Sequence, residues 1–359
     1  MTDLAAKRLA LERLINAKGI RRVYPSMLLP AGPYFDLAGE EFGRRLVLTL
    51  GNDGVEYCLR PEFTLPMAQT YLKGEQGPAA LSYLGPVFRQ RDHGPVEFEQ
   101  AGLELLAQAD AEQALDRVFQ FASDALAVFD IGAPAITLGS VAMFEALLAA
   151  VEIPDVWRPR IRHRFGHPQS LASLLQRLAD PHGASGNIRS RPRDALIAEI
   201  SGKMVEAGLS LTSGRSAEEI ADRFLEKQAL AAAYVPGETI ELLSAYLEIS
   251  GSAEAALGQI AALISKHTGA FSTAMEIVAA HAAALAARAP GARVVFDAGF
   301  SPRLDYYTGV VFEMRGAGDD VLASGGQYSR LLQRLGAGRK VQAAGCAVWV
   351  GRLEREANP

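Results

Sequence analysis

The sequence contains little cysteine and no excess of positive charge. Only two of its 359 residues are cysteines. Cys58 and Cys346 lie in apolar surroundings, and they are too few for a disulfide framework or a thiolate metal site. The formal net charge is −5, whereas a protein that wraps nucleic acid needs a surplus of clustered lysine and arginine. We therefore expect a protein of a reducing cytoplasm that does not bind nucleic acid.

Long apolar runs are also missing. No uninterrupted run reaches the roughly 20 residues that a membrane-spanning helix needs, and the alanine-rich stretch 271–289 is broken by Glu276, His281 and Arg288. Residues 1–22 interleave charged and apolar side chains, which is typical of an amphipathic helix and not of a secretory signal. The sequence therefore predicts a cytoplasmic protein that makes no membrane contact.

Histidine is scarce, with six residues in the chain. His163 and His167 have the i,i+4 spacing that can place two metal ligands on one helix face. Gly166 and Pro168 flank the second histidine, however, and would interrupt such a helix. We expect a surface loop here, and the sequence implies no metal and no other cofactor.

What is present is the composition of a globular protein with a sizeable core, 49% hydrophobic and 21% charged, in one large domain or two. Residues 44–50 and 55–65 are strand-like and flank a Gly-Asn-Asp-Gly turn, which is a hairpin signal. Residues 81–90 and 96–108 form a second strand pair, and residues 111–129 have the 3.6-residue apolar period of a helix. The pattern predicts an α+β fold with an antiparallel sheet.

The character of the sequence changes between residues 154 and 255. This segment is rich in helical patterns, arginine and proline, and 180–194 reads as an exposed loop. Four strand-like pieces then follow between residues 292 and 351. We expect a core built from residues 1–153 and 256–359, with 154–255 as a helical insertion.

Two arginine series occur in the predicted insertion. They are Arg158, Arg160, Arg162 and Arg164, and then Arg189, Arg191 and Arg193. One interpretation is a solvated positive rim. The other is a docking surface for an acidic partner or for phosphate groups, because such patches steer association. No stacking aromatics are interleaved with the arginines, which argues against nucleic acid.

Polar residues interrupt three apolar strand-like pieces at positions that share a face. Residues two apart in a strand point to the same side. The sets that share a side are Gln100, Gly102 and Glu104; Glu62 and Thr64; and Tyr307, Gly309 and Val311. Because glycine has no side chain, the glycine positions leave room for a ligand on the sheet.

The two carboxylates in these sets indicate a cationic ligand. Burying Glu62 or Glu104 is costly unless the charge is paired or hydrogen-bonded, and a ligand cation would supply the partner. The alternative is that they form ion pairs with protein arginines such as Arg60 or Arg89, or lie in water at a sheet edge.

The segments that carry these residues resemble a known family. "YLGPVFRQ" followed by "EFEQAGLELL" is similar to the second signature of class II aminoacyl-tRNA synthetases. "LRPEFT", "LDYYTGVVFE" and "SGGQYSRLL" are similar to the histidyl-tRNA synthetase branch. The resemblance runs from about Leu28 to Arg352 and is weakest in the predicted insertion. It implies the class II synthetase fold, an antiparallel sheet flanked by helices.

Carried over position by position, the resemblance implies a histidine-binding set. Its members are Glu62, Thr64, Arg89, Gln100, Glu104 and Tyr307, with Tyr306 adjoining. Carboxylates can pair with an ammonium and with an imidazole N–H, and an arginine suits a carboxylate. Residue chemistry therefore indicates an amino-acid site, and the identity of histidine comes from the resemblance.

The sequence departs from the synthetase pattern where ATP would react. Attack on the α-phosphate requires a preorganised cation, and the synthetase pattern has an arginine for this purpose. Pro302 occupies that position, and Arg303 stands where the pattern has a glycine. We expect no catalytic residues in this chain.

Further departures affect the nucleotide. The segment between the two strands 81–90 and 96–108 is a few residues shorter than in the synthetase pattern, and its usual Glu-Arg pair reads Arg91-Asp92. Arg352 matches a phosphate-contacting arginine, but the bulky Trp349 stands where a glycine is expected. Seven residues follow Arg352, so no anticodon-binding domain is expected.

This combination resembles the regulatory subunits of ATP phosphoribosyltransferase, which are synthetase paralogues. The resemblance implies histidine as a feedback effector, a homodimer formed through the N-terminal signature region, and assembly with a short-form catalytic subunit into a hetero-oligomer for the first step of histidine biosynthesis. One alternative is a truncated histidyl-tRNA synthetase-like enzyme or ligase that activates an amino acid. Another is a binding module that carries tRNA or another protein without sensing histidine.

Overall fold

The structure is a computed structural model, and it describes residues 4–37, 40–74, 77–91, 94–179, 192–207, 216–265, 271–289, 291–302 and 304–358. The chain divides into two compact units. Unit 1 comprises Met1–Ala146 and Tyr246–Pro359, and unit 2 comprises Leu147–Ala245. No helix within the described ranges is long and apolar enough to cross a lipid bilayer.

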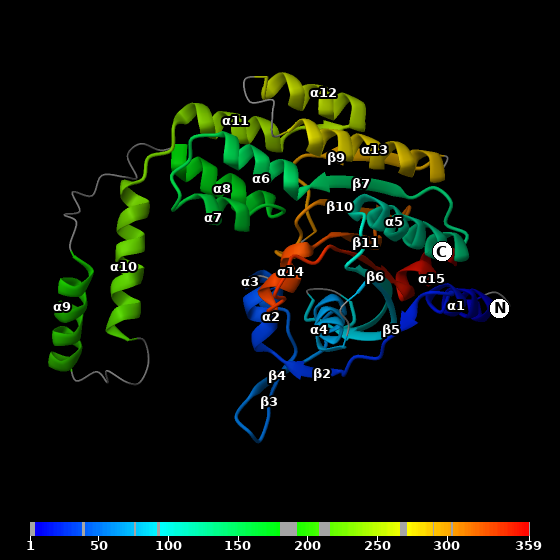
Figure 1. The fold of residues 1–359 in the computed structure, drawn as a ribbon, viewed down its shortest axis with the longest axis horizontal. Helices are drawn as coiled ribbons and strands as arrows, with labels where there is room; N and C mark the ends of the chain where they lie inside the picture. Colours follow the sequence, from blue (N-terminus) through cyan, green and yellow to red (C-terminus); the bar gives the residue numbers. More distant parts are fainter. Residues whose placement is uncertain are drawn as a thin grey trace. The chain divides into compact units, whose positions relative to one another are not determined.

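Unit 1 is built on a sheet of nine strands, in the order β1-β5-β6-β12-β11-β10-β7-β9-β8. Figure 1 labels β5, β6, β11, β10, β7 and β9 of this sheet. In that order the strands are Arg21–Arg22, Ala79–Phe88, Glu97–Leu106, Ala343–Trp349, Val321–Gln327, Val310–Arg315, Ala135–Ser140, Arg293–Asp297 and Ser250–Gly251. The strands from β5 to β7 pair antiparallel, and parallel pairs occur only outside them, β1 with β5 and β7 with β9. The predicted α+β fold with an antiparallel sheet is confirmed.

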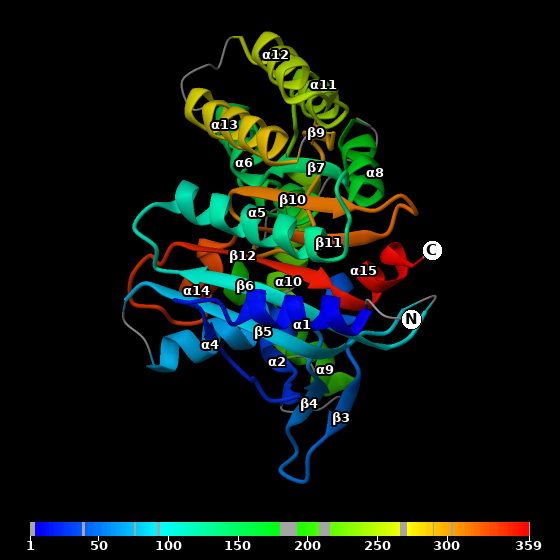
Figure 2. The same ribbon diagram turned by 90° about the vertical axis from the view of Figure 1, so that its right-hand side faces the viewer.

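Helix α5 (Ala111–Val128) covers one face of this sheet (Figure 2). The Asp110 side chain begins the helix by accepting hydrogen bonds from two backbone N–H groups of the first turn, which is a favourable N-cap. The apolar side of α5 packs on β11 and β12. Helices α1 (Leu4–Ile15) and α13 (Ser272–Arg288) pack against α5, so the core lies between the sheet and these helices.

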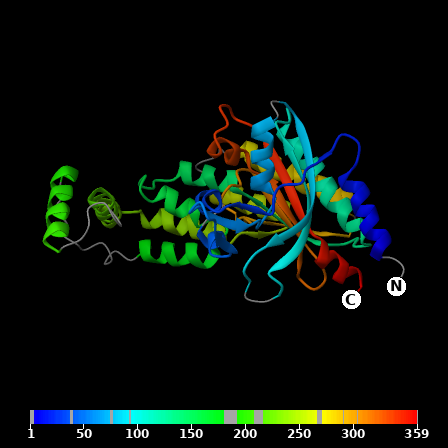
Figure 3. The same cartoon turned by 90° about the horizontal axis from the view of Figure 1, so that it is seen from below.

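Helix α4 (Thr64–Gly74) lies on the opposite side of β5 and β6 from α1 and α5 (Figure 3). Near it in sequence is a second sheet with the order β2-β4-β3, formed by Leu28–Pro30, Glu56–Leu59 and Leu48–Leu50. The predicted hairpin is confirmed as β3 and β4. Its turn closes with Gly51 N–H donating to Val55 O at 2.9 Å, and Gly54 has φ +77°, which glycine adopts readily.

The other short helices of unit 1 connect or flank these layers. They are α2 (Gly32–Leu37), α3 (Glu40–Gly43), α12 (Ala253–Leu263), α14 (Ser329–Arg334) and α15 (Val350–Ala357). Helix α14 packs on α4, and α15 packs on β6 and β11. Helices α6 (Val141–Ala150) and α11 (Gly237–Leu247) extend across the boundaries of the two units.

Unit 2 is helical in the residues described. Its helices include α7 (Arg158–His163), α8 (Pro168–Ala179), α9 (Arg193–Glu206) and α10 (Ala217–Ala232). As predicted, the chain breaks its helix between His163 and His167, because Gly166 takes φ +82° and α8 begins at Pro168. Residues 180–191 of the predicted loop, including Arg189 and Arg191, lie outside the described residues.

Three of the predicted basic residues of unit 2 make contacts within that unit. Arg158 donates to the carbonyl oxygens of Leu148 and Val151. Arg160 pairs with Glu226 at 2.6 Å, and Arg193 makes two hydrogen bonds to Asp222, at 2.6 and 2.8 Å. Arg158 therefore has a structural role, whereas the Arg193–Asp222 pair remains half exposed, as a solvated rim would be.

Candidate functional site

Glu104 is a buried carboxylate at the centre of the sheet. It is 1% exposed in β6, with Leu81 of β5 and Gly345 of β12 as its cross-strand neighbours. The Thr64 hydroxyl donates to its Oε1 at 2.8 Å, and the Tyr328 hydroxyl donates to its Oε2. Two hydroxyl groups from opposite ends of the sequence therefore fix the orientation of this carboxylate.

Glu62 lies at the start of α4 and is 5% exposed. Its carboxylate accepts hydrogen bonds from the backbone N–H groups of Thr64, at 2.5 Å, and Leu65, at 3.0 Å. A carboxylate in this position satisfies N–H groups that have no partner inside the helix and lies at the positive end of the helix dipole. The sequence Glu-Phe-Thr-Leu thus places Glu62 and Thr64 next to Glu104.

Burial raises the pKa of both carboxyl groups. The pKa of Glu62 rises to about 7, although the hydrogen bonds from Leu65 and Thr64 and the charge of Arg89 oppose the rise. The pKa of Glu104 rises to about 8, because burial and the negative charge of Glu62 outweigh the hydrogen bonds from Tyr328 and Thr64. Each group is therefore held partly or mostly protonated at neutral pH.

The alternative of an internal ion pair is wrong for the described part of the chain. No lysine or arginine nitrogen described there forms an ion pair with Glu62 or Glu104. Arg60 instead donates to the carbonyl oxygens of Pro25, at 2.5 Å, and Pro86, at 2.7 Å. The alternative of a wet edge is wrong as well, since both carboxylates are buried.

Arg89 offers a guanidinium near Glu62, since each influences the pKa of the other. Its Nε donates to Pro61 O at 2.8 Å, and its guanidinium lies 5.1 Å from the ring of Phe98. Burial and the nearby charge of Arg91 lower its pKa to about 10, while the charge of Glu62 opposes the change. Its terminal nitrogens form no hydrogen bond with any described residue, so they are available to an anionic group.

Gln100 is a buried amide on the same face of β6 as Glu104. It is 2% exposed and pairs in the sheet with Gly85 and Trp349. Its side chain forms no hydrogen bond within the described ranges. Its amide can both donate and accept, so a ligand group or a water can be its partner.

Two tyrosines complete the predicted set. Tyr306 is 3% exposed and Tyr307 is 7% exposed, and their ring centroids are 5.2 Å apart. The Tyr306 ring makes an edge contact with the Tyr328 ring at 5.8 Å. Burial, followed by the charge of Glu104, raises the pKa of Tyr307 well above the ordinary phenol value, so the hydroxyl remains neutral. We call the predicted residues together with Tyr328 the carboxylate site.

The space beside two predicted glycines is already filled, contrary to the expectation that it holds a ligand. A Cβ at position 102 would lie 2.2 Å from the Tyr83 hydroxyl, which donates to Cys346 O at 3.2 Å. A Cβ at position 309 would lie 1.9 Å from Oε1 of Gln327. The space over each glycine is therefore occupied by a side chain of the protein itself, Tyr83 over Gly102 and Gln327 over Gly309.

Three residues that shape the carboxylate site were not predicted from the sequence. Tyr328 holds Glu104, Tyr83 fills the space over Gly102, and Gly345 leaves room for the Glu104 carboxylate, whose Oε2 lies 1.7 Å from the position of a Cβ there. Tyr328 stands inside the segment "SGGQYSRLL", which was the only signal for it. The roles of the other two depend on cross-strand pairing.

The positions that depart from the ATP-binding pattern are only partly described by the structure. Pro302 is buried and accepts a hydrogen bond from Leu304 N at 2.7 Å, whereas Arg303 and Asp92 lie outside the described residues. Arg91 rests on the Phe98 ring at 3.6 Å. Trp349 pairs with Gln100 in the sheet, and its ring lies 5.3 Å from the Arg352 guanidinium.

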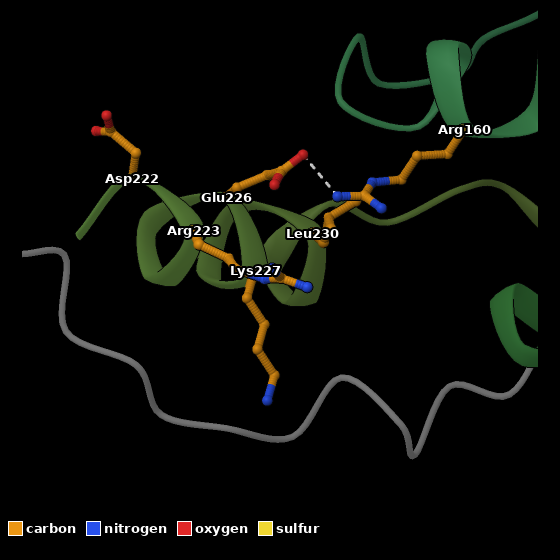
Figure 4. A pocket seen from close by; sticks show the side chains of 6 residues that line it. All are labelled: Arg160, Asp222, Arg223, Glu226, Lys227 and Leu230. Carbon is orange, nitrogen blue, oxygen red and sulfur yellow. Dashed lines mark hydrogen bonds and ion pairs between the residues drawn. The ribbon is translucent and has the colours of Figure 1, made fainter. Parts of the chain in front are cut away.

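Unit 2 has an open cavity of about 790 Å³ (Figure 4). Its lining residues are Arg160, Asp222, Arg223, Glu226, Lys227 and Leu230. The Arg160–Glu226 ion pair crosses it, and basic and acidic groups are mixed along α10. This mixture of charges indicates no particular ligand, in contrast to the carboxylate site.

Comparisons with known proteins identify relatives of this chain. A family model described as histidyl-tRNA synthetase matches residues 2–183 and 209–353. The ATP phosphoribosyltransferase regulatory subunit of Mesorhizobium japonicum is 39% identical over 363 residues, covering 97% of this chain and 96% of the relative.

Solved structures show the same fold. An ATP phosphoribosyltransferase regulatory subunit/histidyl-tRNA synthetase from Bacillus halodurans is similar with a TM-score of 0.68 and 23% identity, over 99% of this chain and 79% of that one. A chain of the ATP phosphoribosyl transferase complex from Thermotoga maritima has a TM-score of 0.56 and 14% identity, with 98% of each chain covered. With its synthetase fold and its relatives along nearly the whole length, the chain belongs to the family of ATP phosphoribosyltransferase regulatory subunits.

Proposed function

We propose that this chain binds free histidine at the carboxylate site and thereby regulates an ATP phosphoribosyltransferase. The observation that carries the proposal is the pair Glu62 and Glu104, two buried carboxylates without a cationic partner in the described residues, beside the available terminal nitrogens of Arg89. The site thus combines two carboxyl groups that a ligand cation can ionise with a guanidinium whose terminal nitrogens have no partner among the described residues.

The ligand that suits this arrangement is a zwitterion with an additional N–H group. Glu62 and Glu104 suit the ammonium and an imidazole N–H of histidine, and Arg89 suits its carboxylate through paired hydrogen bonds. Thr64, Gln100, Tyr306 and Tyr307 supply further polar contacts around it. A ligand without a cationic group would leave the two carboxyl groups largely protonated and would gain no ion pair from them.

The partner in this proposal is a short-form catalytic subunit. The name of the Mesorhizobium relative and the complex from Thermotoga maritima support it. Histidine acts as an effector if it binds one state of the hetero-oligomer better than another, with a coupling of about 1 to 3 kcal/mol. The assembly then belongs in the cytoplasm, where the nucleotide and sugar phosphate substrates of such an enzyme are available.

A homodimer within this assembly is proposed through the small sheet β2-β4-β3. Large apolar side chains are exposed there, among them Met27 at 54%, Leu28 at 49%, Leu48 at 44% and Leu50 at 73%. Such a cluster is typical of a surface that is covered in the assembled protein. Sedimentation analysis of the isolated chain tests this part, and a monomer at micromolar concentration would contradict it.

Two measurements test the proposed function. Calorimetry of the purified chain should show histidine binding that is lost in Glu104→Ala. Phosphoribosyl transfer by the short catalytic subunit should depend on this chain and fall when histidine is added. Absence of histidine binding would refute the site, whereas binding without any effect on transfer would refute the regulatory role.

A further inference from the structure

We propose that His281, Glu112 and Gln327 form a relay on the α5 side of the sheet that positions the carboxylate site, so that histidine affinity depends on the protonation of His281. This inference rests on the proposed function, because it concerns the regulation of the same site. The members of the relay come from α13, α5 and β11.

His281 is clamped between two carboxylates. It is 3% exposed on α13, and its Nε2 lies 2.6 Å from Glu112 Oε2, while its Nδ1 lies 3.1 Å from Asp116 Oδ1. Glu112 and Asp116 are one turn apart on α5. A neutral imidazole has a single N–H group, so only the protonated ring donates to both carboxylates at once.

The surrounding charges favour that protonated form. Burial by itself lowers the pKa of His281, but the hydrogen bonds and charges of Glu112 and Asp116 outweigh burial and raise it above the ordinary value. On α13 itself, Arg288 donates to Asp116 O at 3.0 Å.

The other elements packed on α13 bring few charges. They are β7, β9 and α12. Strand β7 has no titratable residue, β9 has Arg293 and Asp297 only at its two ends, and α12 has Glu254 in its first turn. The two carboxylates of α5 are therefore the charged groups that face the imidazole within hydrogen-bond distance.

Glu112 connects the clamp to Gln327. Its second oxygen, Oε1, lies 3.4 Å from Nε2 of Gln327, which also donates to Ala111 O at 3.3 Å. These two acceptors orient the amide so that its oxygen points the other way. If His281 loses its proton, Glu112 and Asp116 compete for a single N–H group, and the hold of His281 on Glu112 weakens.

The oxygen of Gln327 holds the backbone next to the tyrosine pair. Its Oε1 accepts a hydrogen bond from Val310 N at 3.0 Å. The amide lies directly over Gly309, where a Cβ would be 1.9 Å from the same oxygen. Thr308 N donates to the backbone oxygen of Gln327 at 2.8 Å. Gln327 thus holds the segment that directly follows Tyr307, together with Val141, whose N–H donates to Gly309 O at 2.9 Å.

Gln327 and its neighbour Tyr328 carry the connection across the sheet. Residues next to each other at a strand end point to opposite faces. Gln327 reaches Glu112 on the α5 side, whereas the Tyr328 hydroxyl reaches Glu104 on the α4 side. A shift of Gln327 therefore moves both Tyr307 and Tyr328, two residues of the carboxylate site.

Because the pKa of His281 is raised in the folded chain, the clamp is complete at low pH. Its contribution to stability is fully present below the ordinary histidine value and is lost as pH rises through the raised value. Gln327 is a positioning residue in this scheme, since its side chain acts on the site through the backbone and through its neighbour.

The test compares the ratio of histidine dissociation constants, variant over wild type, between pH 6 and pH 9. His281→Gln cannot become charged, so its ratio should be about ten at pH 6 and fall toward one at pH 9. Gln327→Leu should weaken binding about tenfold throughout this range. Glu276→Gln, an exposed change on the same helix, is the control and should give a ratio of one. A His281→Gln ratio that does not change with pH would overturn the relay.

A second readout does not require histidine. The His281 pKa, followed by NMR, should fall in Glu112→Gln, and hydrogen exchange at the Val310 amide should become faster in Gln327→Leu. If the wild type binds no histidine, the proposed function fails by itself. Unchanged exchange at Val310 together with an unshifted His281 pKa would overturn the relay separately.

Discussion

The carboxylate of Glu104 occupies the place where a side chain of residue 345 would be. The two residues are direct partners across β6 and β12, and a Cβ on Gly345 would lie 1.7 Å from Glu104 Oε2. The glycine is therefore part of the site although it has no functional group, because it lets the carboxylate lie flat on the sheet between the Thr64 and Tyr328 hydroxyls.

Gly345→Ala should disturb the site more than the fold. The added methyl group must displace Glu104, which breaks the hydrogen bonds from Thr64 and Tyr328. We expect a loss of about 1 to 3 kcal/mol in unfolding free energy and the loss of histidine binding. Denaturant unfolding and calorimetry measure the two effects. Gly351→Ala, where an added Cβ meets nothing within 4 Å, is the matched control.

Histidine binding should release protons near neutral pH. Glu62 and Glu104 have pKa values of about 7 and 8 in the free protein, and a bound cation favours their ionised forms. We expect the release of about one proton per site at pH 7 and, in His281→Gln, where residue 281 cannot titrate, tighter binding as pH rises from 6 to 8. Calorimetry in buffers of different ionisation enthalpy measures the release, and an enthalpy that is independent of buffer would contradict it.

Glu104→Gln should make stability less dependent on pH. The pKa of Glu104 is about 8 in the folded chain against an ordinary value of 4.5, so the folded state holds a proton that the unfolded state has already lost. Stability of the wild type without ligand therefore falls as pH rises through this interval. Unfolding followed from pH 5 to pH 9 should show a smaller fall in the variant, and an equal or larger fall would show that Glu104 is not the group responsible.

The chain should not form an aminoacyl adenylate. Pro302 stands where the synthetase pattern has its arginine, and loss of one such stabilising group costs about a hundred- to a thousand-fold in rate. In ATP–pyrophosphate exchange with histidine, we expect no signal above a control without protein. Robust exchange would instead favour the ligase alternative.

Arg158→Gln should weaken unit 2 from within. Its guanidinium donates to the carbonyl oxygens of Leu148 and Val151, close to the end of α6, and pairs with Asp155 at 3.5 Å. We expect a loss of about 1 to 3 kcal/mol in unfolding free energy. Arg223→Gln on α10 is the control and should have little effect. If Arg158→Gln leaves stability unchanged but slows association with the catalytic subunit, the docking interpretation is correct.

The elements that sequence alone predicts well are those whose signal is local. The apolar period of residues 111–129 predicts α5, and the Gly51–Gly54 turn predicts the β3–β4 hairpin. The polar spacing Gln100, Gly102, Glu104 likewise predicts one face of β6. In each case the residues that make the pattern are neighbours in the chain, so no knowledge of the tertiary structure is needed.

What sequence could not supply is which group fills the space beside a glycine. The glycine at position 102 indicates that some group lies close to the backbone of β6. That group is the Tyr83 side chain of the paired strand β5. Tyr328 is 224 residues away from the Glu104 that it holds. Without strand order and register, a ligand and a protein side chain are equally good occupants of such a gap.

Trp349 limits how this scaffold can be engineered. Its ring stacks on Arg352, whose Nη1 is already committed to Val321 O at 2.7 Å. An arginine introduced at position 302 would therefore supply one cation, while the Arg352 guanidinium would still lie against the Trp349 ring. Conversion of the chain into an adenylating catalyst thus requires changes at both position 302 and position 349. A single substitution at either position is not sufficient.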